Sequence, residues 1–325
     1  MPDNAPVKVA VLDDYQGVAA KMADWRRLDG RAEVTFFRDH LAEPDSVVRR
    51  LKPFDVVCVM RERTPLPAAT LGQLPNLKLV VTTGRRNPSI DMAAAAEGGI
   101  LVCNTGGKAH GAAELTWALI MAMVRRLPVE LAAVRDGRWQ ETVGGDLAGK
   151  TIGVVGLGSL GARIARIAQV FEMTVLAWSP NLTADKAAQH GARLASKDDL
   201  FRLADIVTLH LVLGPRSKGI VGAAELALMK PTAYLVNTSR GPLVDEAALI
   251  DALRRRVIAG AALDVYDVEP LPEGHAFRRL DNVLATPHVG FVTEETYRVF
   301  YREMVEDIVA WLDGVPLRVV TAEPQ

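Results

Sequence analysis

Residues 151–161 read Thr-Ile-Gly-Val-Val-Gly-Leu-Gly-Ser-Leu-Gly, and this stretch decides the fold. Its first five residues have the pattern of a buried strand, and a helix is predicted directly after the glycines, over Ala162–Phe171. Gly156 permits a sharp turn, Gly158 lets a pyrophosphate approach the backbone, and Gly161 lets the helix pack closely on the strand. Glycines also serve ordinary turns, but the flanking strand and helix favour a dinucleotide held at the helix N-terminus.

The next strand, Thr174–Trp178, bears on the choice of dinucleotide. In this motif an acidic residue about 20 positions on normally binds the adenosine ribose. Here the strand ends in Ser179-Pro180-Asn181, with no carboxylate at its tip. A carboxylate would repel a 2′-phosphate, so its absence removes the usual barrier against NADP. The arginine expected in NADP sites is missing as well, so both NAD and NADP stay open as cofactors.

Outward from this turn, short β-branched runs alternate with helical patterns along almost the whole chain. This alternation is typical of parallel sheets covered by helices on both faces, an α/β fold. A largely apolar helix is predicted over residues 112–126, buried either between two domains or by a second subunit. The segment from Pro128 to Gly145 is interpreted as a connecting arm, and a long amphipathic helix is expected over Glu294–Trp311. Strands are expected at Val7–Leu12, Val34–Phe37, Val56–Met60, Leu77–Thr82, Ile100–Cys103, Thr151–Val155, Thr174–Trp178, Ile206–Leu211, Tyr234–Asn237, Gly260–Asp264 and Val283–Ala285.

Bulk properties narrow the class of protein. A chain of 325 residues, 49% hydrophobic and 24% charged, favours two globular domains. A net charge of −1 predicts no attraction to nucleic acid or to an anionic membrane. The longest nearly apolar run, Leu115–Val124, is about half the length that a membrane-spanning helix needs. The two cysteines and the polar start Met1–Pro6 lead us to expect a cytoplasmic protein without disulfides, metal or signal segment.

Ionisable residues follow three of the later predicted strands. Arg240 follows one strand, Asp264 and Glu269 follow the next, and His288 follows the last. Ligands of doubly wound sheets bind outside these strand ends. Hydride transfer to a 2-keto acid needs a cation for the carboxylate, a group that titrates near neutrality, and a carboxylate to orient that group. Each residue alone fits an ordinary loop or surface role, but together they predict a catalytic set of Arg240, Glu269 and His288.

At this point the chain resembles the D-isomer-specific 2-hydroxyacid dehydrogenase family, which includes phosphoglycerate, glyoxylate/hydroxypyruvate and D-lactate dehydrogenases. The likeness lies in residues 156–161, 235–246, 264–270 and 286–290, and upstream in 74–78 and 111–115. It implies a Rossmann domain inserted into a flavodoxin-like substrate domain, both doubly wound parallel sheets. The substrate domain would comprise residues 1–104 and 292–325. Residues 105–291 would form the NAD(P)-binding domain, including a helix and arm through which the family commonly dimerises, so we expect a homodimer.

The resemblance also implies roles for individual residues. Arg240 would bind substrate, His288 would be the acid/base, Glu269 its partner, and Asp264 would contact the nicotinamide amide. Substrate contacts are considered at Arg61, Gly84, Arg85 and His110. The cofactor would be held by Gly156, Gly158, Ser159, Leu160, Gly161, Ser179, His210, Thr238, Ser239, Asp264 and Gly290.

Three segments depart from the family pattern. Ser179 stands where NAD-preferring members carry Asp. The loop Thr83–Asn87 replaces a Gly-x-Gly-Val-Asp type segment, and its Arg85 and Arg86 either read a second anionic group or lie exposed. Phe291 stands where a second small residue is common. The expected function is reduction of a 2-keto acid to a D-2-hydroxy acid, with 3-phosphoglycerate dehydrogenase as one specific form. A dinucleotide-sensing, corepressor-like binding protein is the alternative from another class.

Overall fold

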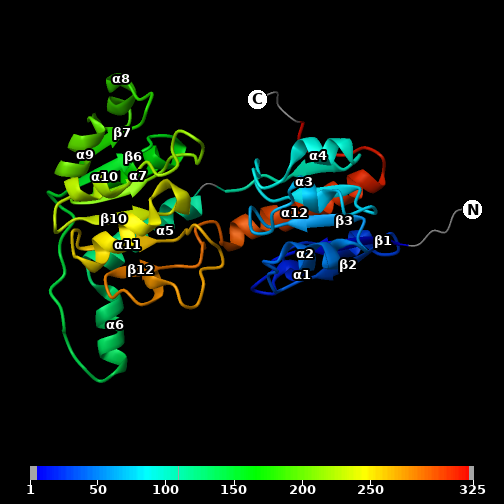
Figure 1. Ribbon diagram of the computed structural model, residues 1–325, viewed down its shortest axis with the longest axis horizontal. Coiled ribbons are helices and arrows are strands. Elements are labelled where there is room, and N and C mark those ends of the chain that lie inside the picture. Colours follow the sequence, from blue (N-terminus) through cyan, green and yellow to red (C-terminus); the bar gives the residue numbers. More distant parts are fainter. Residues whose placement is uncertain (1–5, 109, 322–325) are drawn as a thin grey trace, which may run out of the picture. The chain divides into compact units, whose positions relative to one another are not determined.

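The computed structural model describes residues 6–108 and 110–321, which fall into two compact units (Figure 1). The first unit contains the chain up to Lys108 and again from Thr293 onward. The second unit runs from residue 110 to Val292. Most of the N-terminal stretch Met1–Pro6, from which we expected no signal segment, lies outside the described residues. The domain boundaries expected from the sequence were 104/105 and 291/292. The two units divide within a few residues of these positions, after Lys108 and after Val292.

The first unit is built on a five-stranded parallel sheet with the order β2-β1-β3-β4-β5. This is the flavodoxin-like order of a doubly wound fold. The strands are β1 Val7–Val11, β2 Ala32–Phe36, β3 Val56–Val59, β4 Leu79–Thr82 and β5 Leu101–Asn104. The helices are α1 Ala19–Met22, α2 Pro44–Leu51, α3 Ala68–Leu71, α4 Met92–Glu97 and α12 Glu294–Leu312, with a 3₁₀ turn at Trp25–Leu28.

Local sequence accounts for the end of one helix of this unit and for the packing of another. The glycine pair after α4 closes it, because Gly99 adopts φ +67° and its amide and that of Ile100 bond back to Ala96 and Ala95. Helix α12, drawn in red and orange, lies among the N-terminal elements (Figure 1). It buries Phe300, Tyr301, Met304, Val305 and Ile308, whose spacing forms one apolar stripe.

The second unit is built on a seven-stranded parallel sheet with the order β12-β11-β10-β9-β6-β7-β8. Its strand order reverses between β6 and β9, which is the switch point where doubly wound sheets bind ligands. The strands are β6 Thr151–Val155, β7 Thr174–Trp178, β8 Arg193–Leu194, β9 Ile206–Leu209, β10 Tyr234–Asn237, β11 Gly260–Leu263 and β12 Val283–Ala285. The helices are α5 His110–Val124, α6 Leu127–Arg135, α7 Ser159–Val170, α8 Ala184–Ala188, α9 Lys197–Leu203, α10 Ala223–Leu228 and α11 Glu246–Arg254, with 3₁₀ turns at Gly241–Leu243 and Ala276–Arg278.

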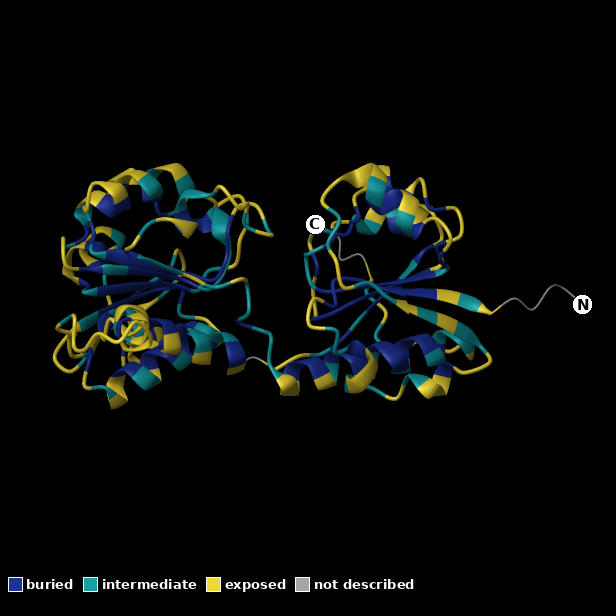
Figure 2. Ribbon diagram, turned by 90° about the horizontal axis from the view of Figure 1, so that it is seen from below, coloured by how far each residue is buried: buried dark blue, intermediate teal, exposed yellow. Residues whose placement is uncertain are grey.

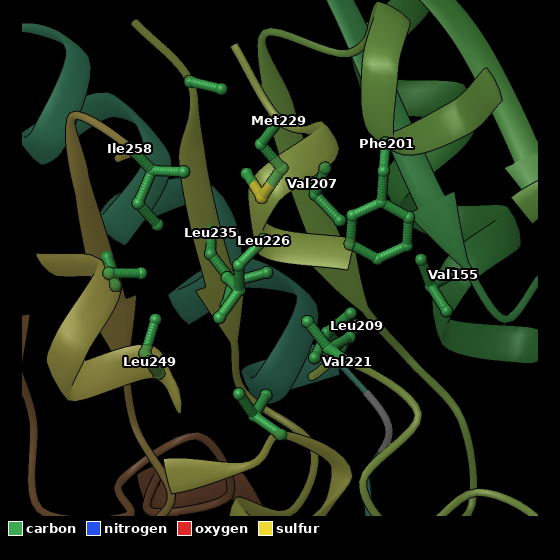
Figure 3. Close-up of a cluster of buried hydrophobic side chains, with 14 of the residues drawn as sticks. Val155, Phe201, Val207, Leu209, Val221, Leu226, Met229, Leu235, Leu249 and Ile258 are labelled. Carbon is green, nitrogen blue, oxygen red and sulfur yellow. The ribbon is translucent and has the colours of Figure 1, made fainter. Parts of the chain in front are cut away.

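Apolar side chains fill both faces of this second sheet. Along β6, Val154 belongs to one buried cluster and Val155 to the other, because successive strand residues point to opposite faces. Figure 3 shows the cluster that contains Val155, with Phe201, Leu226 and Met229 packed on the strand residues. In Figure 2 the strands of each unit are largely buried and lie between helices whose outer sides are exposed. The α/β fold class expected from the sequence is therefore confirmed.

The structure differs from the sequence-based expectation at two short elements. We expected one helix over residues 112–126 and a connecting arm from Pro128. Instead α5 ends at Val124, Arg126 takes a left-handed conformation with φ +54°, and α6 starts at Leu127. Proline fits the first turn of a helix, where its missing N–H has no partner to lose, so Pro128 is accommodated as the second residue of α6. Strand β8, with two residues, is too short to leave a pattern in the sequence.

Helix α5 is buried inside the second unit, against β10, β11 and α7. Its Trp117, Leu119 and Ile120 belong to the buried cluster on that face of the sheet. The apolar side chains left exposed in this region lie mainly on α6 and the segment after it, so a partner is not needed to account for most of the burial of α5. No helix in the described part of the chain is long and apolar enough to cross a membrane.

Candidate active site

Each of the three glycines of the turn after β6 is accounted for by a different feature of the structure. Gly156 has φ +100°, and a Cβ there would come within 2.7 Å of the His210 carbonyl carbon at the end of β9. A Cβ at Gly161 would overlap the Gly156 carbonyl oxygen. A Cβ at Gly158, the residue before α7, would meet nothing within 4 Å. Gly156 and Gly161 are thus required by packing, whereas Gly158 leaves space in front of a helix N-terminus, which fits a pyrophosphate.

Ser159 and Leu160 form the first turn of α7, directly after Gly158. Ser179 follows β7, and its carbonyl accepts a hydrogen bond from the Leu182 amide at 3.1 Å, which turns the chain toward α8. Ser179 is partly buried, and it is followed in the chain by Pro180 and Asn181.

His210 follows β9 beside the switch point. Burial lowers its pKa to about 4, so the ring is neutral near pH 7. Its Nε2 lies 2.9 Å from the Thr208 hydroxyl. Because the ring is neutral, His210 can offer a dinucleotide hydrogen bonds and packing but no positive charge.

The loop that carries Arg240 is held by Asn237, the last residue of β10. The buried Asn237 amide donates to the Arg240 carbonyl at 2.8 Å, and its Oδ1 accepts from the Ser239 amide at 3.1 Å. The Arg240 Nη1 donates to the Ser239 carbonyl at 2.7 Å. Thr238 is tied through its hydroxyl, 2.7 Å from that of Thr116 on α5.

His288 and Glu269 form a direct pair after β12 and β11. The His288 Nδ1 lies 2.6 Å from the Glu269 Oε2, and the other carboxylate oxygen accepts from the Tyr266 amide at 2.9 Å. Since a carboxylate only accepts, this pairing assigns the Nδ1 proton and leaves Nε2 for proton exchange. His288 has φ +52°, and its ring meets the Phe291 ring edge to face with centroids 5.4 Å apart.

Asp264 fixes the backbone on both sides of His288. Its Oδ1 accepts from the Thr286 hydroxyl at 2.6 Å and from the Val289 amide at 2.9 Å, and its Oδ2 accepts from the Gly290 amide at 2.8 Å. Burial raises the pKa of the Asp264 carboxyl, although these hydrogen bonds act in the opposite direction. A Cβ at Gly290 would come within 3.1 Å of this carboxylate, a contact close enough that the carboxylate would have to shift.

A separate cluster in the first unit contains the substrate candidates Arg61 and Gly84. Arg61 follows β3 with φ +54°, its amide donates to the Thr83 hydroxyl at 2.7 Å, and its carbonyl accepts from the Asn87 side chain at 2.7 Å. Gly84 has φ +79°, and a Cβ there would overlap the Arg61 guanidinium. The loop therefore holds a partly buried guanidinium directly over its own backbone.

Two other substrate candidates behave differently. Arg85 and its neighbour Arg86 are exposed to solvent. His110, the first residue of α5, makes a short contact with Arg163 on α7, within the second unit. This contact lies within the second unit and engages the His110 ring.

The parallel strands of the second unit bring the predicted catalytic set to one edge of the sheet. Arg240, Asp264, Glu269 and His288 all follow the carboxyl ends of the adjacent strands β10, β11 and β12. The glycine turn follows β6 in the same sheet, so it lies at the same edge. Sequence reasoning missed Asn237 and Tyr266 as supports of this set. An asparagine that ends a strand three residues before Arg240 is the signal that would have pointed to the first, because it favours a side-chain-capped turn.

Within residues 6–108 and 110–321, no group of three or more His, Cys, Asp or Glu is placed to hold a metal ion. Cys58 and Cys103 are buried free thiols.

Comparisons with known proteins agree with this architecture. Residues 117–290 match the model of the D-isomer specific 2-hydroxyacid dehydrogenase NAD binding domain. A glyoxylate reductase of Aeropyrum pernix is 38% identical over 264 residues, 78% of this chain and 79% of the relative. A D-3-phosphoglycerate dehydrogenase of Archaeoglobus fulgidus is 35% identical over 84% of this chain and 52% of the relative.

The crystal structure of a phosphoglycerate oxidoreductase from Vibrio cholerae superposes with a TM-score of 0.90 at 37% identity, covering 95% of this chain and 99% of that one. The chain therefore belongs to the D-isomer specific 2-hydroxyacid dehydrogenase family, and its second unit is an NAD(P)-binding domain. It spans about half the length of the D-3-phosphoglycerate dehydrogenases among its curated relatives.

Proposed function

We propose that this chain is an NAD(P)-dependent oxidoreductase that interconverts a 2-keto acid and a D-2-hydroxy acid. The observation that carries the proposal is the 2.6 Å contact between His288 and Glu269 at the sheet edge that also holds the glycine turn. A histidine whose Nδ1 is held by a carboxylate presents its Nε2 for proton transfer to a substrate. Family membership favours this dehydrogenase over the dinucleotide-sensing binding protein.

His288 and Arg240 have complementary tasks in this proposal. When bound, the nicotinamide supplies or accepts the hydride. In reduction, the His288 Nε2 donates a proton to the keto oxygen while hydride adds to C2, so the carbonyl becomes a hydroxyl and the histidine is left neutral. Glu269 stabilises the protonated ring before this step. Arg240 binds the substrate carboxylate and polarises the carbonyl, for which a planar guanidinium is suited.

The proposal assigns one task to each unit. The second unit holds the dinucleotide. Its contacts are Gly158, the first turn of α7 and the other cofactor-binding residues that the family resemblance implies. The first unit is the substrate domain. This assignment is supported by the guanidinium of Arg61, which lies over Gly84 and is suited to bind a substrate carboxylate. A local contact engages His110, so it is the weakest of the predicted substrate residues.

We further propose that two copies associate through α6 and the segment that follows it. Leu127, Leu131 and Val134 are spaced to share one face of α6, and their exposed fractions are 43%, 59% and 58%. Trp139 and Val143 follow at 76% and 95% exposed. An apolar patch of this extent fits a self-complementary interface.

The two buried free thiols support a reducing, cytoplasmic location.

The acid/base role is tested with variants of the His288–Glu269 pair. His288→Asn removes the proton donor, so kcat is expected to fall by about three orders of magnitude or more, with the Kd for the dinucleotide nearly unchanged. Glu269→Gln keeps the shape of the side chain but not its charge. The kcat of this variant for keto acid reduction is therefore expected to fall at a lower pH than that of the wild type. Stopped-flow rates and fluorescence titration of NADH or NADPH measure both. A His288→Asn enzyme as fast as wild type would contradict the assignment.

Substrate and cofactor are tested together. NADH and NADPH are titrated against glyoxylate, hydroxypyruvate, pyruvate, 3-phosphohydroxypyruvate and a branched 2-keto acid. Because Ser179 does not repel a 2′-phosphate, NADPH is expected to bind, and Ser179→Asp is expected to weaken NADPH by at least about tenfold relative to NADH. Equal discrimination by wild type and Ser179→Asp would exclude this residue as a determinant of cofactor choice.

A further inference from the structure

Tyr266 lies three residues beyond β11, and only 6% of it is exposed. It packs beside Phe277, with ring centroids 6.3 Å apart. Three different parts of this residue touch the three loops that carry Arg240, Glu269 and His288.

Its amide acts on the acid/base pair. The Tyr266 N–H donates to the Glu269 Oε1 at 2.9 Å, while the Glu269 Oε2 is engaged by His288 at 2.6 Å. Each carboxylate oxygen thus has its own donor. The carboxylate is held at both ends, which fixes its direction toward the histidine.

Its peptide bond to Asp267 acts on the arginine loop. Gly241, the residue directly after Arg240, lies against this peptide so closely that a Cβ on Gly241 would overlap the Tyr266 carbonyl group. The arginine loop therefore rests on the backbone of the glutamate loop without a side chain between them.

Its hydroxyl acts on the histidine loop. The Tyr266 hydroxyl lies 3.0 Å from the Leu263 carbonyl oxygen and 2.9 Å from the Thr286 carbonyl oxygen. Leu263 ends β11, and Thr286 stands two residues before His288. Burial raises the pKa of the phenol, so it stays protonated, and a donor, throughout the working pH range.

We propose that Tyr266 is a positioning residue whose hydroxyl fixes the His288 loop in register with the loops of Glu269 and Arg240. This inference rests on the proposed function, because it assigns Tyr266 a task in that same site. A phenylalanine would fill the same space and leave both backbone contacts intact. The part of the task that belongs to the tyrosine side chain is therefore the bond to the Thr286 carbonyl.

Tyr266→Phe tests the proposal, and Tyr301→Phe is the matched control. Tyr301 is another fully buried tyrosine, on α12 in the first unit, and its hydroxyl has no hydrogen-bond partner among the described residues. Loss of the Tyr266 hydroxyl is expected to lower kcat about threefold to tenfold, with the KM for the dinucleotide unchanged. Without the hydroxyl the His288–Glu269 contact is expected to loosen. The high-pH limb of the pH profile, where kcat for keto acid reduction falls, is then expected to move to lower pH than in wild type. Tyr301→Phe is expected to match wild type in both.

A second measurement does not depend on turnover. Hydrogen–deuterium exchange of residues 286–290 is expected to quicken in Tyr266→Phe and to stay at the wild-type rate in Tyr301→Phe. An unchanged pH limb in an active Tyr266→Phe enzyme, or unchanged exchange at 286–290, would overturn the proposal. If no keto acid is reduced even by the wild type, the proposed function fails, while the exchange experiment still decides whether the hydroxyl holds the loop.

Discussion

At the scale of single residues, neighbouring glycines of the turn after β6 are needed for unlike reasons. Gly156 is needed by the fold, since it combines φ +100° with close approach to the His210 carbonyl. A Cβ at Gly158 would meet nothing within 4 Å, so packing does not require a glycine there, and this space fits the proposed approach of a dinucleotide. Both positions look the same in the sequence.

This difference makes Gly156→Ala and Gly158→Ala a matched pair. Gly156→Ala forces a strained backbone and a clash, so the second unit should lose roughly 1–3 kcal/mol of unfolding free energy. Gly158→Ala should leave stability unchanged and weaken dinucleotide binding by about tenfold or more, since a methyl group then occupies the pyrophosphate's approach. Urea unfolding and cofactor titration measure the two effects. The assignment fails if Gly158→Ala binds the dinucleotide as tightly as wild type.

At the scale of elements, α12 fastens the chain's C-terminal segment to the edge of the first sheet. The fully buried Asp307 accepts from Arg318 at 2.9 Å, and Arg318 also donates to Glu306 at 2.9 Å. Beyond the helix, the Val320 amide donates to the Val102 carbonyl at 2.8 Å, so the segment pairs with β5 through an isolated antiparallel bridge. One aspartate on a helix thus anchors the segment that makes this bridge.

Asp307 predicts a pH-dependent stability of the first unit. Burial raises its pKa from 3.8 to about 7, although Arg318 acts in the opposite direction, and Glu303 and Glu306 raise it further. At pH values between the unfolded pKa of 3.8 and the folded pKa of about 7, the Asp307 carboxyl binds a proton in the folded state but not in the unfolded state. The contribution to stability is therefore fully present below about pH 4 and is lost as the pH rises through about 7.

Asp307→Asn removes this titration while keeping an oxygen that can accept from Arg318. The wild type should lose stability relative to Asp307→Asn as the pH is raised from 5 to 8. Urea midpoints of the two proteins at unit pH steps measure the difference, and other titrating groups cancel between them. Parallel curves would show that Asp307 does not titrate in this window.

At the scale of the whole molecule, the chain leaves an apolar stripe on α6 and the segment after it. Replacing Leu131 and Val134 together by Glu places charges in the proposed interface, so the dimer should dissociate at micromolar concentration. Val170→Glu, at an exposed valine that ends α7, is the control and should leave the dimer intact. Light scattering after size-exclusion chromatography gives the masses. A wild-type monomer, or a doubly charged variant that still dimerises, would rule out this interface.

Local signals in the sequence were enough for the α/β class, the family and most strand positions. The run Thr151–Val155, the helix after it and the glycines between them form an unbroken segment, and neighbouring residues determine such a pattern. Strand-end positions of Arg240, Glu269 and His288 could also be predicted, since parallel strands end at one edge. The roles of these residues stay predictions until the variants are measured.

Only the tertiary structure decided what joins residues that are distant in the chain. Gly84, which has φ +79°, faces the guanidinium of Arg61 from another loop, and Asp307 is held by an arginine beyond its own helix. The turn within residues 151–161 needs Gly156 because the carbonyl of His210, which follows another strand, comes close to it. Periodicity and turn chemistry describe contacts within about one element. These contacts depend on how the strands are ordered in each sheet, and that order emerges only when the elements pack.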